Sequence, residues 1–264
     1  MDELNSKGCE KISVIIAAYN AERHIGDCLD SILNQTYKNI EVWVCDDAST
    51  DNTLAILQKY AAEDKRIHVL HNSKNMYAGF SRNRCLEKCS GEYIAIQDAD
   101  DVANPQRFEH LIRTIRNSKC DFVSSGHYLF DDNGIYKESV PQIETPQIKD
   151  FLYGIPFCHA ATLFSKECLL DVNGYRVSKE TRRGQDYDMF MRLYAKGYTG
   201  KNIKNILYGY RVDRDTISRR RFRYRIDECV IRYKGFKNLG LLPGGFLYIF
   251  KPIPAFFVQA LRRR

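Results

Sequence analysis

The sequence predicts an α/β fold with a mostly parallel central sheet and helices on both of its faces. Short apolar runs rich in branched side chains alternate with segments whose apolar residues recur at helical spacing. Several of these runs end in polar or acidic side chains, which is where a parallel sheet binds its ligands. With 264 residues, of which 44% are hydrophobic, the chain can bury one substantial core.

The first strand and the first helix are predicted next to each other. Residues 12–18 are almost entirely apolar and rich in branched side chains, as in a strand that is buried on both faces. Within residues 21–34, Ile25, Leu29 and Ile32 recur at helical spacing and form one apolar face.

A second strand–helix unit and two further strands follow. Residues 40–45 form another apolar run, and residues 51–62 are predicted as a helix with Leu57 among its inward-facing residues. Residues 66–70 and 92–96 supply the third and fourth strands. Because strand–helix alternation makes consecutive strands parallel, their carboxyl ends are expected at one edge of the sheet.

A β-hairpin is predicted farther along the chain. Residues 121–130 and 135–140 read as strands, and they flank the segment Asp131-Asp132-Asn133-Gly134. An Asn-Gly pair between two such strands is a strong signal for a tight turn.

The strand over residues 92–96 leads into three carboxylates, Asp98, Asp100 and Asp101. Like charges this close repel one another unless a cation or hydrogen-bond donors neutralise them. Carboxylates at a strand end can hold Mg or Mn together with the phosphates of a substrate. The alternative is a helix N-cap, favoured by Pro105, which accounts for Asp101 without requiring the other two.

Two common phosphate-binding motifs are absent from the sequence. Ala17-Ala18-Tyr19-Asn20 follows the first strand in place of Gly-x-Gly-x-x-Gly, and no Gly-Lys-Ser/Thr loop occurs. A dinucleotide site is therefore not expected.

Six segments together resemble the family 2 glycosyltransferases, which have the GT-A fold. The segments are SVIIAAYN (13–20), SILNQTY (31–37), EVWVCDDASTD (41–51), SRN (81–83), GEYI (91–94) and DADD (98–101). The resemblance extends from about Ile12 to Tyr210. It implies a non-processive enzyme, since the transmembrane helices and the Gln-x-x-Arg-Trp motif of processive members are missing.

The resemblance implies that Ala17, Tyr19, Asp47 and Asp98 bind a UDP-sugar donor. Asp47 would accept the uracil N–H, a role that suits an acceptor-only carboxylate, and is preferred to its neighbour Asp46. Tyr19 would stack on the uracil ring, although a core tyrosine is the alternative. Asp100, with Asp98, would bind Mn or Mg, and this cation would offset the charge that grows on the departing UDP.

A second motif, Gly184-Gln185-Asp186-Tyr187-Asp188, is similar to the Glu-Asp motif of the family, with Gln185 in place of the glutamate. The resemblance implies that Asp186 is the general base for the acceptor hydroxyl and that the reaction inverts the anomeric carbon. The alternative for Asp186 is a helix cap. Asp188 is expected to be structural or to hold the acceptor.

Three more residues receive weaker assignments. His159 falls where related enzymes form part of the acceptor pocket, but a lone histidine is more often structural, and it is left out of the catalytic set. Arg182 and Arg183 suit either the binding of an anionic group or a solvated loop.

The basic charge is concentrated at the C-terminal end. Residues 201–264 contain 16 lysines and arginines against four acidic residues, whereas the whole chain has a net charge of +7. Residues 241–261 are rich in aromatic side chains and interrupted by prolines, so they fit a transmembrane helix poorly. Together with the arginines at 219–225 and 262–264, they suit peripheral contact with an anionic membrane. The alternative is a tail that packs back on the domain.

These features predict one GT-A domain over residues 1–215, with a nucleotide-binding half over 1–118 and an acceptor half over 119–215. Residues 216–264 would be a basic, aromatic-rich extension.

Nine cysteines without a Cys-x-x-Cys pair argue against zinc. Their odd number and the absence of a signal peptide predict a reducing cytoplasm, with the protein peripheral on the inner face of the cytoplasmic membrane.

The expected activity is that of an inverting, metal-dependent hexosyltransferase. It would move one sugar from a UDP-sugar to a sugar or lipid-linked sugar acceptor in bacterial surface-polysaccharide assembly. A haloacid-dehalogenase-like phosphatase with Asp98 as nucleophile is an alternative, but that family carries its motif on the first strand. A nucleic-acid-binding protein is a further alternative. Here, however, the arginines are interleaved with a hydrophobic tail, so no nucleic-acid partner is expected.

Overall fold

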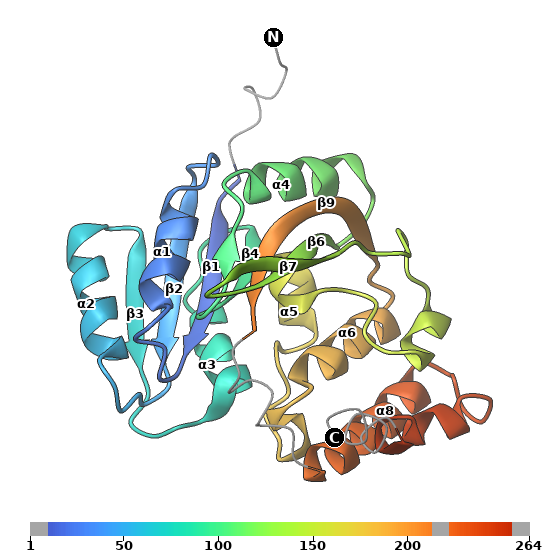
Figure 1. Ribbon diagram of the computed structural model, residues 1–264. Coiled ribbons are helices and arrows are strands. Elements are labelled where there is room, and N and C mark those ends of the chain that lie inside the picture. The colour runs from blue at the N-terminus through green and yellow to red at the C-terminus, as the bar shows by residue number, and fades with distance from the viewer. Residues whose placement is uncertain (1–9, 213–221, 255–264) are drawn as a thin grey trace.

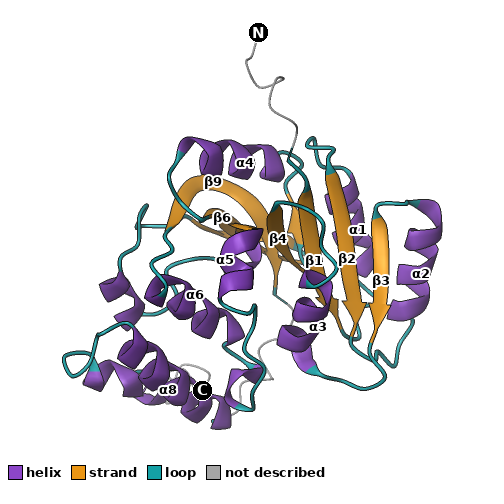
Figure 2. Cartoon of the chain, turned by 180° about the vertical axis from the view of Figure 1, so that it is seen from behind, coloured by secondary structure: helices purple, strands orange, loops and turns teal. Residues whose placement is uncertain are grey.

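The computed structural model describes residues 10–212 and 222–254. A nine-stranded sheet runs through the molecule in the order β3-β2-β1-β4-β8-β6-β9-β5, with β7 paired to β6 (Figure 1). Seen from behind, α3 and α5 lie in front of the sheet and α1 lies on its far side (Figure 2).

The first four large strands form the parallel part of the sheet. They are β1 (Ile12–Ala18), β2 (Ile40–Asp46), β3 (Ile67–His71) and β4 (Tyr93–Asp98). Their connections contain α1 (Ile25–Leu33), α2 (Thr53–Glu63) and α3 (Tyr77–Leu86). This alternation confirms the predicted strand–helix units.

Helix α1 begins at Ile25 rather than at residue 21. Asn20 has a left-handed backbone (φ 49°), and its Oδ1 accepts a hydrogen bond from Thr50 N at 2.8 Å. The N–H of Ala21 is used by Thr53 Oγ1 at 2.8 Å. These contacts bind the turn after β1 to the turn after β2, so the helix starts only beyond them.

Beyond β4 the sheet is mixed. The elements are β5 (Val102–Ala103), α4 (Arg107–Asn117), β6 (Phe122–Asp131), β7 (Gly134–Ser139), β8 (Thr162–Ser165) and β9 (Gly200–Arg211). Strand β8 is antiparallel to both β4 and β6, and β9 is parallel to β6 but antiparallel to β5. The β6–β7 hairpin is present as predicted, and its tight turn requires an antiparallel pair.

The helices after β8 close one side of the molecule. They are α5 (Lys166–Asp171), α6 (Gln185–Ala195) and α8 (Arg223–Asn238), with the 3-10 turns η4 (Glu180–Arg182) and η5 (Phe246–Phe250). Two further 3-10 turns, η2 (Ile148–Leu152) and η3 (His159–Ala161), precede β8. Alternate residues of β1 point to opposite faces, so Ile15 belongs to one apolar core and Val14 to the other. Helices α3, α5, α6 and α8 complete the first core, and α1, α2 and α4 complete the second.

The described part of the C-terminal extension packs on the domain. Ile231 and Phe236 of α8 are fully buried, and Ile249 of η5 joins the same core. Ile226 and Tyr233, on the other side of α8, are about half exposed. Arginines 219–221 and 262–264 lie outside the described residues. No helix in residues 10–212 and 222–254 is long and apolar enough to cross a bilayer.

Candidate active site

The predicted donor residues meet at the carboxyl edge of the parallel strands. Ala17 of β1 pairs with Cys45 of β2 on one side and with Asp98 of β4 on the other. Tyr19 and Asp47 directly follow the ends of β1 and β2, and Asp100 is two residues beyond the end of β4. The strand register therefore brings together five residues from three separate segments.

Asp47 and Asp46 are both buried and held by specific donors. Asp47 Oδ1 accepts from Asn72 Nδ2 at 2.6 Å and from Met76 N at 2.8 Å. Asp46 Oδ2 accepts from Ser49 N at 3.2 Å and lies 2.9 Å from the Nδ1 atom of His71. Asp46 Oδ1 is buried and has no hydrogen-bond partner among the described residues. An orphaned acceptor of this kind calls for a donor from a ligand or from water.

Tyr19 is not a core tyrosine. Its side chain is 49% exposed at the end of β1. The core alternative is therefore wrong, and an aromatic face is available for stacking on a planar ring.

Asp101 does not cap a helix. It is 1% exposed, and its carboxylate accepts from Tyr208 OH at 2.8 Å and from Arg211 N at 2.7 Å. Burial raises its pKa well above the ordinary value, and the charges of Asp98 and Asp100 act in the same direction. The N-cap of α4 is Gln106. Asp101 instead fastens β9 to the end of β4, and the prediction of a cap was wrong because these partners lie over a hundred residues away.

Asp98 and Asp100 are more exposed to solvent than Asp101. One oxygen of Asp98 lies 2.5 Å from Arg82 Nη2, and the side chain is 29% exposed. Asp100 is exposed, and its main-chain oxygen accepts from Arg211 Nε at 3.0 Å. Among the described residues no group of three or more His, Cys, Asp or Glu could enclose a cation. One or two carboxylates at an open edge fit Mg or Mn, which keep waters and take phosphate oxygens as further ligands.

Asp186 lies in the first turn of α6 rather than at its cap. The N-cap is Gly184, whose φ of 100° is left-handed and suits glycine. The cap alternative is therefore wrong. Burial raises the pKa of Asp186, whereas the hydrogen bond from its neighbour Tyr187 and the positive charge of Arg82 lower it.

Arg82 links the two acidic motifs. It is 5% exposed on α3, pairs with Asp98, and lies with its guanidinium 5.6 Å from the ring centre of Tyr175. With its amide turned to satisfy both neighbours, Gln185 accepts from Arg82 Nη1 at 3.2 Å. The sequence contained Arg82 within the matched SRN segment but gave it no role. A charged side chain on the buried face of a helix was the available signal.

His159 and Asp188 have structural partners. His159 is buried, its Nε2 is 2.8 Å from Tyr175 OH, and burial lowers its pKa well below the ordinary value. Asp188 forms ion pairs of 2.7 Å with both Arg176 and Arg192. The structural alternative for each residue fits these contacts.

The chain is similar to known glycosyltransferases over most of its length. Residues 13–168 match the model of "Glycosyl transferase family 2". A "Putative glycosyltransferase EpsE" of Bacillus subtilis is 37% identical over 95% of this chain and 90% of its own length. The Escherichia coli "UDP-Glc:alpha-D-GlcNAc-diphosphoundecaprenol beta-1,3-glucosyltransferase WfaP" is 31% identical over 88% of each chain.

Two solved structures share the fold. S. aureus TarS 1-349 in complex with UDP-GlcNAc aligns with a TM-score of 0.70 at 21% identity, over 85% of this chain. The chain spans 66% of the length of that structure. The mannosyltransferase PcManGT from Pyrobaculum calidifontis, in complex with GDP-Man and Mn2+, gives a TM-score of 0.65 at 18% identity, over 92% of this chain and 68% of its own.

Proposed function

Because the chain belongs to glycosyl transferase family 2, we propose that it moves one sugar from a UDP-sugar to a hydroxyl group of a sugar or lipid-linked sugar acceptor. The observation that carries the proposal is the position of Arg82, which contacts Asp98 of the donor edge and whose charge acts on Asp186. The residues proposed to bind the donor and to deprotonate the acceptor thus both interact with Arg82, a buried cation.

The preference for uridine rests on the buried acceptors at the end of β2. The carboxylate of Asp47 is held by two hydrogen bonds to its Oδ1 atom. The neighbouring residue Asp46 has a buried oxygen, Oδ1, without a partner among the described residues. Such acceptors suit the imide N–H of uracil. TarS with UDP-GlcNAc and the UDP-Glc named for WfaP support this choice. The GDP-Man of PcManGT makes GDP the necessary comparison.

Asp100 and Asp98 would hold Mn or Mg. The cation supplies positive charge against the developing negative charge of the leaving diphosphate. Arg82 neutralises one oxygen of Asp98, which reduces the repulsion between Asp98 and the neighbouring carboxylates.

Asp186 would take the proton from the acceptor hydroxyl. A pKa raised by burial makes it a stronger base, while the charge of Arg82 helps to keep it ionised. Attack by the activated hydroxyl from the side opposite the leaving diphosphate inverts the anomeric carbon.

A place in surface-polysaccharide assembly, at the inner face of the cytoplasmic membrane, is part of the same proposal. It is supported by the lipid diphosphate in the name of WfaP and by the basic charge of residues 201–264.

Thermal unfolding with nucleotides tests the donor. UDP with Mn should raise the melting temperature, since a ligand that binds only the folded state stabilises it. GDP with Mn should raise it less, and an oligonucleotide should not raise it. A screen of UDP-sugars for hydrolysis, with and without EDTA, then tests the metal. In this screen Asp100→Asn should behave like wild type in EDTA. Undiminished turnover in excess EDTA would exclude metal dependence.

A further inference from the structure

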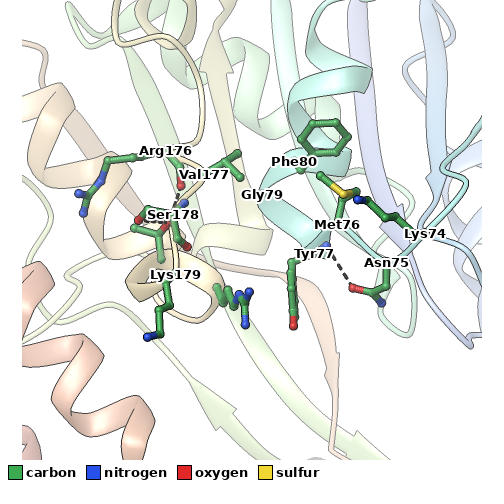
Figure 3. Close-up of a pocket in the computed structure, with 12 residues that line it drawn as sticks. Lys74, Asn75, Met76, Tyr77, Gly79, Phe80, Arg176, Val177, Ser178 and Lys179 are labelled. Atoms are coloured by element: carbon green, nitrogen blue, oxygen red, sulfur yellow. Dashed lines mark hydrogen bonds between the residues drawn. The ribbon is translucent and has the colours of Figure 1, made fainter.

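A cavity of about 450 Å³ opens next to the candidate active site, and we call it the basic pocket. One wall is the segment from Lys74 to Phe80 at the start of α3, and the other is the segment from Arg176 to Arg182 (Figure 3). Figure 3 shows Lys74 on the first wall and Lys179 on the second.

The basic pocket is lined by residues that contact the predicted site, but not by the predicted site residues themselves. Met76 donates its N–H to Asp47 at 2.8 Å, so the first wall is tied to the donor edge. A Cβ on Gly79 would lie 3.8 Å from the Cβ of Gln185, the residue before Asp186. A group bound here would therefore lie beside residues that contact Asp47 and precede Asp186.

Positive charges in the basic pocket are only partly neutralised. Arg176 is paired with Glu180 at 3.2 Å and with Asp188 at 2.7 Å. Lys74, Lys179 and Arg182 are exposed, and within the described chain none has a carboxylate partner. Three cations around one cavity repel one another, and a bound anion would relieve this repulsion.

The second wall is held in place. Arg182 lies 4.5 Å above the ring of Tyr77 on the opposite wall. Glu180 accepts from Lys234 of α8 at 2.6 Å, and this contact lowers the pKa of Glu180 to about 2. The cations of the second wall therefore lie on a segment that contacts both α3 and α8.

We propose that the basic pocket binds the diphosphate of a lipid-linked sugar acceptor. This assignment rests on the proposed function. A diphosphate carries several negative charges. It can therefore pair with three cations, one of them an arginine, whereas a ligand with a single carboxylate cannot. The donor diphosphate is expected at Asp98 and Asp100, whereas this pocket adjoins Gln185 and hence the residue expected to receive the acceptor's proton. WfaP, by name, acts on a sugar linked to diphosphoundecaprenol.

Calorimetric titration with inorganic pyrophosphate tests the assignment. The whole chain is titrated at constant ionic strength in metal-free buffer, alone and after saturation with UDP. Pyrophosphate should bind in both cases. Lys179→Gln combined with Arg182→Gln should weaken pyrophosphate binding about tenfold or more and leave UDP affinity unchanged. Lys59→Gln with Arg113→Gln, two exposed residues on other helices, is the matched control and should change neither affinity.

Each failure has a distinct meaning. If UDP displaces pyrophosphate, or the double variant loses both ligands equally, the pocket belongs to the donor and the assignment is overturned. If glucuronate, a single carboxylate, binds wild type as tightly as pyrophosphate, the diphosphate specificity is overturned. If UDP binds and pyrophosphate does not, only the pocket assignment fails. If UDP itself does not bind, the proposed function fails and the acceptor assignment fails with it.

Discussion

At the scale of one residue, the buried charge of Arg82 contacts both acidic motifs of the candidate site. It is nearly inaccessible to solvent, and its partner Asp98 is the last residue of β4. Removing one member of a buried ion pair leaves the other charge uncompensated, which commonly costs about 3–5 kcal/mol. Replacing Arg82 is therefore expected to lower both stability and activity. Substitutions of the nearby carboxylates distinguish the two effects better.

Replacement of Asp186 by asparagine should reduce transfer on the order of a hundredfold or more, because a positioned base is lost. Binding of UDP should persist, since its predicted contacts come from Tyr19, Asp47 and Asp98. Turnover and calorimetry with the same preparation check both points.

Asp188→Asn is the comparison for that experiment. It should lower the melting temperature, because Asp188 is paired with Arg176 and Arg192, and it should reduce turnover less. If Asp188→Asn abolished turnover at unchanged stability, while Asp186→Asn retained it, the two roles would be exchanged.

Glu41 should make the free energy of unfolding depend on pH. Burial by itself would raise its pKa, but hydrogen bonds from Ser13 at 2.5 Å and Ser90 at 2.6 Å outweigh burial and lower the pKa from 4.5 to about 2. The resulting stabilisation is present above the unfolded pKa and is lost as the pH falls from 4.5 towards 2.

Glu41→Gln should therefore lower the free energy of unfolding by about 3 kcal/mol at neutral pH. At about pH 3 it should lower it by less than half as much. Urea unfolding of wild type and variant at both pH values measures the difference. The exposed Glu63→Gln should change stability by less than about 0.5 kcal/mol at either pH. An equal effect of Glu41→Gln at both values would contradict the linkage.

The sequence predicted residue positions better than residue partners. The register at the strand ends follows from strand–helix alternation, so Tyr19, Asp47 and Asp98 could be placed at one edge in advance. The different partners of Asp98 and Asp101 could not be predicted, because Arg82 and Tyr208 come close to them only through tertiary packing.

At the scale of elements, α8 supports the site from a distance. Its buried face packs on α6, and Lys234 holds Glu180 at the wall of the basic pocket. A Cβ on Gly235 would lie 2.2 Å from Met191 Sδ, so any side chain at position 235 must displace the buried side chain of Met191.

Gly235→Val should destabilise the protein by about 1–3 kcal/mol, because the overpacked contact outweighs the gain in helix propensity. The melting temperature should fall by several degrees, at roughly 2–4 °C per kcal/mol for a chain of this size. Gly244→Val is the control, since its nearest neighbour would be 4.0 Å away. Equal melting temperatures for Gly235→Val and wild type would show that α8 does not need this close approach.

Elements with a local signal were predicted well. The strands over residues 12–96 and the β6–β7 hairpin have their own periodicity or turn sequence. The pairing of β9 with both β6 and β5 has no such signal, because it is set by contacts between distant segments.

At the scale of the whole molecule, the turn η5 presents exposed apolar side chains next to a lysine. Leu247 is 80% exposed, and Phe246 and Phe250 are each about half exposed, on the 3-10 turn η5. Lys251 follows directly. Exposed apolar side chains beside positive charge are typical of surfaces that contact anionic membranes.

Sedimentation with lipid vesicles tests this surface. The protein should bind vesicles with anionic lipid more strongly than neutral ones, and salt should weaken binding without abolishing it. Leu247→Glu should remove much of the salt-resistant part, whereas Ile135→Glu, on exposed strand β7, should have no effect. Equal binding to neutral and anionic vesicles, or none to either, would exclude this contact.

The contacts that hold β9 at the end of β4 limit how this chain can be recombined with its relatives. Asp101 lies in the half expected to bind the donor (1–118), whereas Tyr208 and Arg211, which satisfy its buried carboxylate, lie on β9 near the end of the half expected to bind the acceptor (119–215). A chimera that takes its donor half from one enzyme and its acceptor half from another must preserve this trio. Otherwise it leaves a buried carboxylate without donors. Exchange of sugar specificity between relatives is therefore better attempted at exposed loops than by joining halves.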